Sequence, residues 1–115
     1  NIKIKYDLES EISTNYSFNE LKNIIFNMIK NCIEQKKLNN QDEVIMLIDI
    51  IKEDDLLIKI EDNIKGENKK IDENRYSNSY LYLVKLFVEK NKGLFWFEST
   101  NYDTTYYIKL KNENI

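Results

Sequence analysis

Apolar residues recur at helical spacing in two stretches of the chain and alternate with polar residues in several others. The first helical stretch runs from about Phe18 to about Lys36. Its apolar stripe is made by Leu21, Ile24, Ile25, Met28, Ile29, Cys32 and Ile33. Ser17 followed by Glu20 predicts a capping box at the start of this helix, since each side chain can bond to the other residue's amide.

The second helical stretch runs from about Tyr80 to about Asn91, with its apolar residues on one face. These residues are Leu81, Val84, Phe87 and Val88. Gly93 stands just beyond them, where a residue in the left-handed conformation often ends a helix. The pattern therefore predicts two amphipathic helices and places the second helix end at Gly93.

Alternating segments predict strands at 2–8, 43–52, 56–61, 94–98 and 104–111, with a further short strand around Ile12. The lysines of the first segment suit an edge strand. Segment 43–52 is apolar on both faces, which predicts a sheet covered at least partly on both sides. These elements together predict an α+β fold. We expect a mostly antiparallel sheet with both main helices on one face and Cys32 buried between helices and sheet.

Composition narrows the range of functions. The 115 residues, 42% hydrophobic and 32% charged, predict one globular domain over residues 1–115 and no second domain. A net charge of -3 with interspersed signs gives no indication of nucleic-acid binding. No signal peptide and no run of about twenty apolar residues is present, so we expect no membrane contact by this domain. Because the sequence begins with Asn, we expect it to be part of a longer protein.

The chain has a single cysteine, Cys32, and no histidine. This excludes a disulfide within the chain and any Ser-His or Cys-His nucleophile pair, and it argues against a zinc site. Cys32 lies on the apolar helical face, where a small buried hydrophobic residue is expected.

Four segments resemble motifs of one family. Residues 27–34, NMIKNCIE, resemble the N box (N-L-x-x-N-A-x-E), and residues 56–63 resemble the strand entering a D-x-G-x-G box. Residues 81–99 resemble a G-L-x-L-V-x-x-I-V-E-x-x-G-G-x-I-x-V-x-S segment, and residues 104–110 resemble a closing G-T-T-F-x-I-x-L strand. These motifs, in this order, are those of histidine kinases among the GHKL ATPases. The resemblance implies their Bergerat fold, a two-layer α/β sandwich with a mixed sheet.

The resemblance also implies a nucleotide site. Asn27 and Asn31 match the two N-box asparagines, and Asn31 would be the Mg²⁺ ligand; Asp62 would accept from the adenine amino group, and Gly66 matches the second glycine of D-x-G-x-G. The implied cofactor is Mg-ATP, held with no catalytic side chain of this domain. In the alternative, both asparagines are surface residues of an Asn-rich chain, Asp62 merely ends a strand, and no cofactor is bound.

Several positions depart from the family pattern. Ile64 replaces the first glycine of D-x-G-x-G, residues 76–80 (YSNSY) replace a G-x-G-x-G loop, and Asp103 replaces the glycine before Thr104. The lid, at about 63–79, lacks the family's F box. Because glycines let amides approach phosphates closely, these changes predict weakened nucleotide binding.

Two functions remain open. The first is the C-terminal ATP-binding domain of a two-component sensor histidine kinase, with weakened or lost nucleotide binding. The second is a non-catalytic pseudo-kinase or phosphotransferase-type domain that acts through protein contacts. Both imply a helical, histidine-containing dimerisation domain and a response regulator as partners. We expect a cytoplasmic location, in a full-length protein that can carry a membrane anchor.

We also expect a contact surface on the sheet. Whichever of the pairs Leu94/Trp96 and Phe95/Phe97 points away from the helices would leave large apolar groups uncovered, suited to a homodimer or a partner domain. The alternative is that long side chains such as Lys109 lie over these groups.

Overall fold

The computed structural model describes residues 2–8, 14–64 and 79–112. Its elements are β1 (Ile2–Leu8), α1 (Phe18–Leu38), β2 (Val44–Lys52), β3 (Leu56–Asp62), α2 (Ser79–Lys90), β4 (Leu94–Ser99) and β5 (Thr104–Leu110). The strand expected around Ile12 lies outside the described residues. The other predicted elements are confirmed, with ends within two or three residues of those expected from the sequence pattern.

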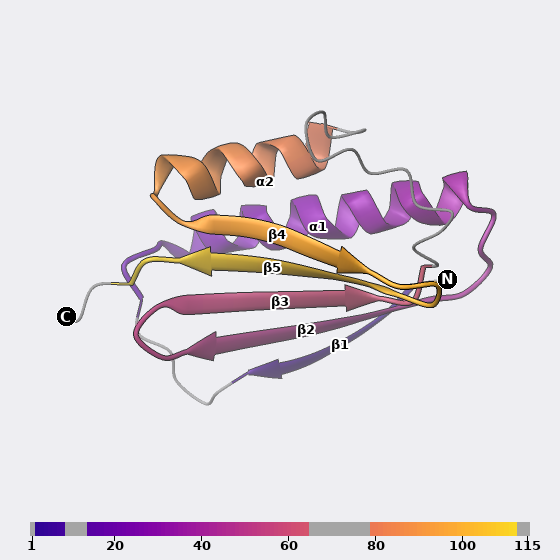
Figure 1. Cartoon of the computed structure of the whole chain (residues 1–115), viewed down its shortest axis with the longest axis horizontal. Coiled ribbons are helices and arrows are strands. Elements are labelled where there is room, and N and C mark those ends of the chain that lie inside the picture. The colour runs from indigo at the N-terminus through magenta and orange to yellow at the C-terminus, as the bar shows by residue number, and fades with distance from the viewer. Residues whose placement is uncertain (1, 9–13, 65–78, 113–115) are drawn as a thin grey trace.

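The strands form one five-stranded sheet in the order β1-β2-β3-β5-β4. β1 runs parallel to β2, and the remaining pairs are antiparallel. Both helices lie on the same face of the sheet (Figure 1). The predicted two-layer α+β sandwich is thus confirmed, including the place of β1 at an edge.

The core lies between the helices and the sheet. Alternate residues of the strands point toward the helices, among them Met46, Ile58 and Ile108, which are 1% exposed or less. From α1, the buried residues include Ile24, Met28 and Cys32. Cys32 is 1% exposed, so its predicted burial is confirmed.

The beginning of α1 is fixed by the predicted capping box. The Glu20 amide donates to Ser17 Oγ at 3.1 Å, and the Ser17 amide donates to Glu20 Oε1 at 2.8 Å. These bonds satisfy amides that have no partner within the helix.

The end of α2 differs from the prediction. The left-handed residue is Lys92, with φ of 58°, and Gly93 has no positive φ. The Lys92 amide bonds to the Glu89 carbonyl at 3.0 Å and the Gly93 amide to the Val88 carbonyl at 2.9 Å, which is a Schellman ending. Gly93 is needed for another reason: a Cβ there would lie 2.3 Å from the Lys109 carbonyl oxygen on β5.

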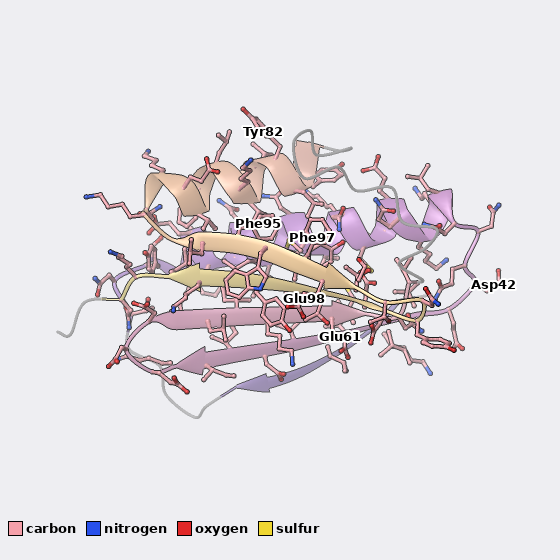
Figure 2. All side chains as sticks on the ribbon, viewed as in Figure 1. Asp42, Glu61, Tyr82, Phe95, Phe97 and Glu98 are labelled. Atoms are coloured by element: carbon pink, nitrogen blue, oxygen red, sulfur yellow. The ribbon has the colours of Figure 1, made fainter. Side chains whose placement is uncertain are left out.

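The face of the sheet turned away from the helices, called here the outer face, has no covering layer among the described residues. Leu94 is 61% exposed, Leu47 39%, Trp96 38% and Ile51 36%. The expectation of cover on both faces is therefore wrong for the described chain, because both helices pack on the same face. Phe95 and Phe97 lie on the helix side of β4 (Figure 2), so Leu94 and Trp96 are the pair that points away. Trp96 stacks on Tyr107, with ring centroids 5.0 Å apart.

Candidate functional site

A row of three amides runs along α1. Asn27, Asn31 and Gln35 follow one another at four-residue steps and therefore share one line on the helix. Asn31 is 0% and Gln35 1% exposed, whereas Asn27 is only half-buried. The N-box spacing identifies Asn27 and Asn31 but not Gln35, although the same four-residue step leads to it.

Asn31 makes a hydrogen bond inside the core. Its Nδ2 donates to the Tyr106 hydroxyl at 3.2 Å, across 75 positions of sequence. Tyr106 is 1% exposed and stands where the family resemblance has phenylalanine. Its hydroxyl was not foreseen, although its place in the alternating pattern of β5 puts its side chain on the helix side.

Burial and charge both act on Tyr106. Burial raises its pKa well above the usual value, the negative charge of Asp62 raises it further, and the hydrogen bond from Asn31 offsets part of this. These effects place Asn31, Asp62 and Tyr106 in one polar centre within the core. The structure therefore brings together two of the predicted site residues.

Asp62 ends β3 on the helix side and is 1% exposed. Its Oδ1 accepts the Ile64 amide at 3.1 Å, which closes a tight turn after the strand. Ile64 follows with a side chain that is 0% exposed and belongs to the hydrophobic core. The residue that replaces the family's first glycine is thus a packed core residue.

Asn27 faces a different space. With Glu20, Asn23 and residues Leu83, Val84 and Phe87 of α2, it lines a hollow of about 240 Å³ between the two helices. Neither Asn31 nor Asp62 lines this hollow. This hollow therefore does not bring Asn27 together with the other predicted nucleotide-binding side chains.

Other predicted features bear on cofactor binding. Gly66 and nearly all of the lid, from residue 65 to 78, lie outside the described residues. Within the described residues no three His, Cys, Asp or Glu side chains cluster as a metal site. Gln35 Nε2 is buried and has no hydrogen-bond partner among the described residues. None of the described helices has the length and apolar character to cross a membrane.

No protein-family model matches the sequence. No curated protein matches it either. Solved structures do match. Histidine kinase AdeS of Acinetobacter baumannii is 15% identical with a TM-score of 0.73, and the match covers 98% of this chain and 55% of that one. The histidine kinase domain of the blue-light activated kinase EL346 of Erythrobacter litoralis is 12% identical, with a TM-score of 0.74 and coverages of 95% and 54%.

The catalytic domain of histidine kinase ThkA, in a nucleotide-free form, is 13% identical with a TM-score of 0.68, over 96% of this chain and 78% of that one. The chain spans about half the length of the first two kinases. At these identities the likeness concerns the fold. The chain has the α+β sandwich fold of histidine kinase catalytic domains.

Proposed function

We propose that this chain is the ATP-binding-type domain of a two-component sensor histidine kinase in which nucleotide binding is weakened. The proposal is supported by the fold shared with three histidine kinases and by four motif-like segments in family order. Its partners would be a helical dimerisation domain that carries a histidine and a response regulator, in the cytoplasm.

The proposal of weakened binding rests on one observation. Side chains at the positions that match the nucleotide site take part in the packing and hydrogen bonding of the core. Asn31, the proposed Mg²⁺ ligand, has no exposed surface and donates to Tyr106. Ile64, at the position of a glycine, is fully buried in the core. A Mg²⁺ ligand must reach the ion directly, so Asn31 would have to leave its bond to Tyr106 in order to bind the ion. A close approach of nucleotide at position 64 would likewise require Ile64 to leave its core contacts.

Asp62 keeps the chemistry for adenine but lacks access. A carboxylate can accept from an amino group, yet Asp62 is 1% exposed and its Oδ1 already accepts from Ile64. Adenine would have to open this turn. The described residues therefore do not fit Mg-ATP as they stand, and we derive no phosphoryl-transfer step through them.

The second candidate is a non-catalytic domain that acts through protein contacts. The observation in its favour is the outer face, where Leu94 and Trp96 are 61% and 38% exposed. Apolar groups gathered on an exposed face commonly mark a contact surface. This candidate needs no nucleotide, so ligand binding separates it from an active kinase domain.

A thermal melt with and without Mg-ATP tests the proposal. We expect a dissociation constant of roughly 1 mM or weaker, which at 1 mM ligand stabilises by only about 0.4 kcal/mol. A constant of about 10 µM would give roughly 2.7 kcal/mol. For a domain of this size the first value raises Tm by about 2–3 °C and the second by more than about 10 °C.

Variants show whether any shift comes from the proposed site. A shift in Tm that arises at this site should disappear in Asp62→Asn and in Asn31→Ala. It should remain in Asn19→Ala, which changes an exposed residue on the same helix as Asn31. A large shift that both site variants remove would overturn the weakened-binding proposal and favour an active kinase domain.

A further inference from the structure

A second line of apolar side chains runs along α1, apart from the stripe that faces the core. Phe18, Phe26 and Ile33 are 79%, 49% and 38% exposed. They are eight and seven residues apart, and side chains at such steps return to one line on a helix. At about 100° per residue, this line lies roughly 140° from the stripe through Ile24 and Met28 that faces the core. The side of α1 that carries the exposed line is called here the α1 flank.

The α1 flank is turned away from α2. The residues of α1 that line the hollow beside α2, among them Ile24 and Asn27, lie on other sides of the helix. α2 packs on β4 and β5 at one end of the strand order, so the flank faces the end formed by β1. Ile4 of β1 is in register with Met46 and therefore points to the helix side, where it is 42% exposed. The described fold thus leaves apolar groups exposed on the flank and on the helix side of β1.

Lysines gather on and beside the exposed line of α1. They are Lys22, Lys30, Lys36 and Lys37. At about 100° per residue, all four lie within about 70° of the line. The acidic residues of α1, Glu20 and Glu34, lie more than about 100° from it. The α1 flank is therefore basic, although the chain as a whole has a net charge of -3.

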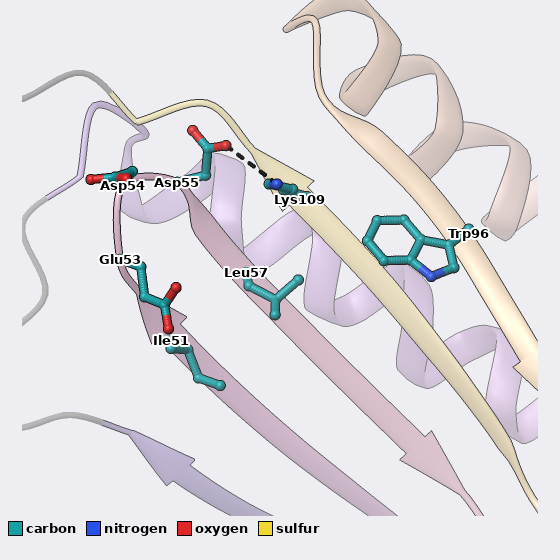
Figure 3. Close-up of a pocket in the computed structure, with 7 residues that line it drawn as sticks. All are labelled: Ile51, Glu53, Asp54, Asp55, Leu57, Trp96 and Lys109. Atoms are coloured by element: carbon teal, nitrogen blue, oxygen red, sulfur yellow. Dashed lines mark ion pairs between the residues drawn. The ribbon is translucent and has the colours of Figure 1, made fainter.

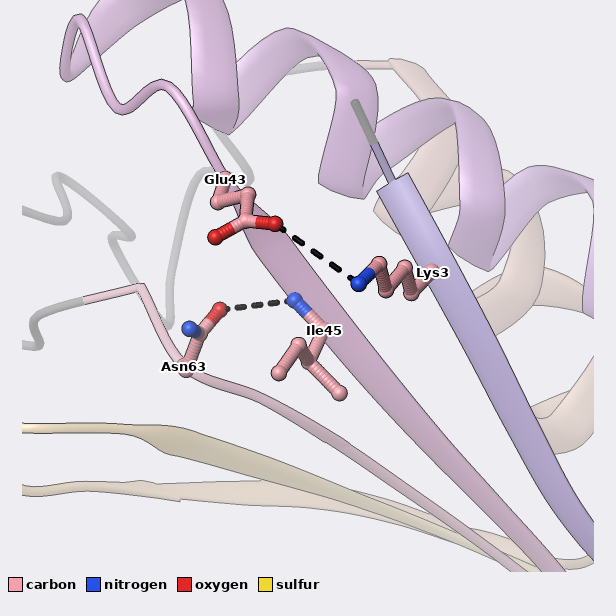
Figure 4. A network of polar contacts seen from close by, with 4 residues as sticks. All are labelled: Lys3, Glu43, Ile45 and Asn63. Atoms are coloured by element: carbon pink, nitrogen blue, oxygen red, sulfur yellow. Dashed lines mark hydrogen bonds and ion pairs between the residues drawn. The ribbon is translucent and has the colours of Figure 1, made fainter.

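Carboxylates do not neutralise these lysines within the described structure. Ion pairs do hold lysines on other elements. Lys109 Nζ lies 3.7 Å from Asp55 Oδ2 (Figure 3), and Lys3 Nζ lies 3.8 Å from Glu43 Oε1 (Figure 4). None of the four lysines of the flank forms an ion pair with another described residue. A partner with carboxylates would thus meet charges that the described residues do not pair.

Charged and apolar groups alternate along the flank. Lys22 Nζ lies 5.9 Å from the centre of the Phe18 ring and 5.8 Å from that of the Phe26 ring, so a cation stands between the two aromatic groups. A helix that lies in a lipid surface has its apolar groups together on one face. A protein helix can instead place a carboxylate opposite a lysine and an apolar group opposite each ring. The alternation therefore favours a protein partner over a lipid surface.

We propose that the α1 flank binds an acidic amphipathic helix of a partner protein. Apolar side chains of the partner pack on Phe18, Phe26 and Ile33, and its Asp or Glu side chains meet the lysines between and beside them. Phe18 and Ile33 are 15 residues apart, or about 22 Å along a helix, so a partner helix of about 15 residues spans the site. This binding is independent of nucleotide and goes beyond the function proposed above.

Charge argues against a second copy of the chain as the occupant. Two α1 flanks packed on each other by a twofold axis would bring lysines against lysines, because each copy presents the same surface. Like charges brought together at an interface oppose association. The complementary partner is therefore acidic.

The test uses synthetic peptides that carry a fluorophore, with binding followed by fluorescence anisotropy. The probe is a helical peptide of about 15 residues with leucines in a heptad stripe and glutamates between them. One control has lysines in place of the glutamates, and another is a scrambled peptide of the same composition as the probe. We expect the acidic stripe peptide to bind saturably and both controls to bind at least about tenfold more weakly. General attraction to a chain of net charge -3 would favour the basic peptide instead.

Charge-reversal variants locate the binding. Lys22→Glu with Lys36→Glu should weaken the acidic peptide by about tenfold or more, equivalent to about 1.4 kcal/mol. Lys59→Glu with Lys90→Glu makes the same change in net charge on β3 and at the end of α2. This second pair should change the affinity by less than about twofold. Circular dichroism of each variant checks that the fold is intact.

A second pair of variants tests the apolar contacts. Phe26→Ala should weaken the acidic peptide by about fivefold or more, since it removes a ring from the middle of the flank. Tyr82→Ala removes a ring that is 51% exposed on α2 and should leave the affinity unchanged. These variants keep the charge constant, so they separate packing on the flank from attraction between charges.

Four results would overturn the proposal. The first is no binding of the acidic peptide, or equal binding of the scrambled or basic one. The second is equal weakening by the two charge-reversal pairs or by the two alanine variants. The third is co-sedimentation of the chain with phosphatidylserine vesicles that Phe26→Ala removes, which would assign the flank to an anionic lipid surface. The fourth is concentration-dependent self-association that Phe26→Ala removes, which would assign it to a second copy of the chain.

Discussion

Tyr106 is the central residue of the polar centre, since its hydroxyl accepts from Asn31 and the negative charge of Asp62 raises its pKa. The hydrogen bond from the Asn31 side chain to this hydroxyl lies inside the core. A hydrogen bond within a protein contributes about 0.5–1.5 kcal/mol of net stability. The stability of the core therefore depends on a group that the family resemblance did not predict.

Tyr106→Phe tests this dependence. We expect it to lower the free energy of unfolding by about 1–2 kcal/mol at neutral pH, measured by urea unfolding. Tyr102→Phe, at a side chain that is 78% exposed, is the matched control and should have almost no effect. Equal stability of Tyr106→Phe and wild type would mean that the buried amide finds another partner.

The raised pKa of Tyr106 predicts that stability depends on pH, and the same variant tests this. Burial and Asp62 raise the pKa of Tyr106 above its unfolded value of 10.0, so the folded protein keeps this proton when the unfolded chain loses it. The contribution is complete below pH 10 and is lost as the pH rises toward the folded pKa. Wild type should therefore lose stability above about pH 10 more steeply than Tyr106→Phe does.

At the scale of elements, the glycine at the end of α2 stands one position after the residue that adopts the left-handed conformation. Lys92 takes the left-handed conformation and Gly93 fits against the Lys109 carbonyl. Lys92→Gly should stabilise by about 0.5–1 kcal/mol, because glycine adopts a positive φ without a Cβ penalty. Gly93→Ala should destabilise by about 1–3 kcal/mol. Thermal melts of both variants test this, and a stabilising Gly93→Ala would contradict it.

The alternation of β4 predicts opposite outcomes for neighbouring residues. Phe95 stacks near Tyr106, with centroids 6.5 Å apart, on the helix side, whereas Trp96 is on the outer face. Phe95→Lys should cost about 3–5 kcal/mol because it removes a packed ring and brings a charge to the core. Trp96→Lys should cost about 1 kcal/mol or less. Similar losses in urea unfolding would contradict the assignment of faces.

Much of the fold could be predicted from the sequence, because local patterns decide most of it. The capping box at Ser17 depends on residues three positions apart, and the strands follow from alternation. Gly93 was misjudged because its role depends on a carbonyl of another strand. The bond between Asn31 and Tyr106 joins residues 75 positions apart, and no local pattern specifies such a pairing.

The candidate site was less predictable than the fold. A motif identifies Asn31 and Asp62 by spacing, but spacing does not say whether a side chain faces a cleft or the core. Both are at most 1% exposed. The apolar residues on both faces of β2 likewise suggest a cover for the outer face. They do not say which molecule supplies it, because the hydrophobic effect is not directional.

At the scale of the whole molecule, the strand order predicts where the structure opens last. β3 lies at the centre of the sheet, paired on both sides and with alternate residues buried, whereas β4 is an edge strand. We expect the amides of β3 to exchange with solvent most slowly, at rates about tenfold or more below those of β4, because local opening reaches edge strands more easily. Hydrogen exchange followed by NMR measures this. Uniform protection of β4 equal to that of β3 would indicate that something covers its free edge.

The burial of Ile64 makes the departure from the glycine-rich box difficult to reverse. Ile64→Gly would remove a fully buried side chain, at a cost of about 2–5 kcal/mol for the cavity and about 0.5–1 kcal/mol for the added chain freedom. A domain of ordinary stability has only about 5–15 kcal/mol in total. A chain with isoleucine here would therefore lose a large share of its stability in one step on acquiring the glycine. Compensating changes in the core would offset that loss, so a return to a nucleotide-binding loop depends on core packing as well as on the loop itself.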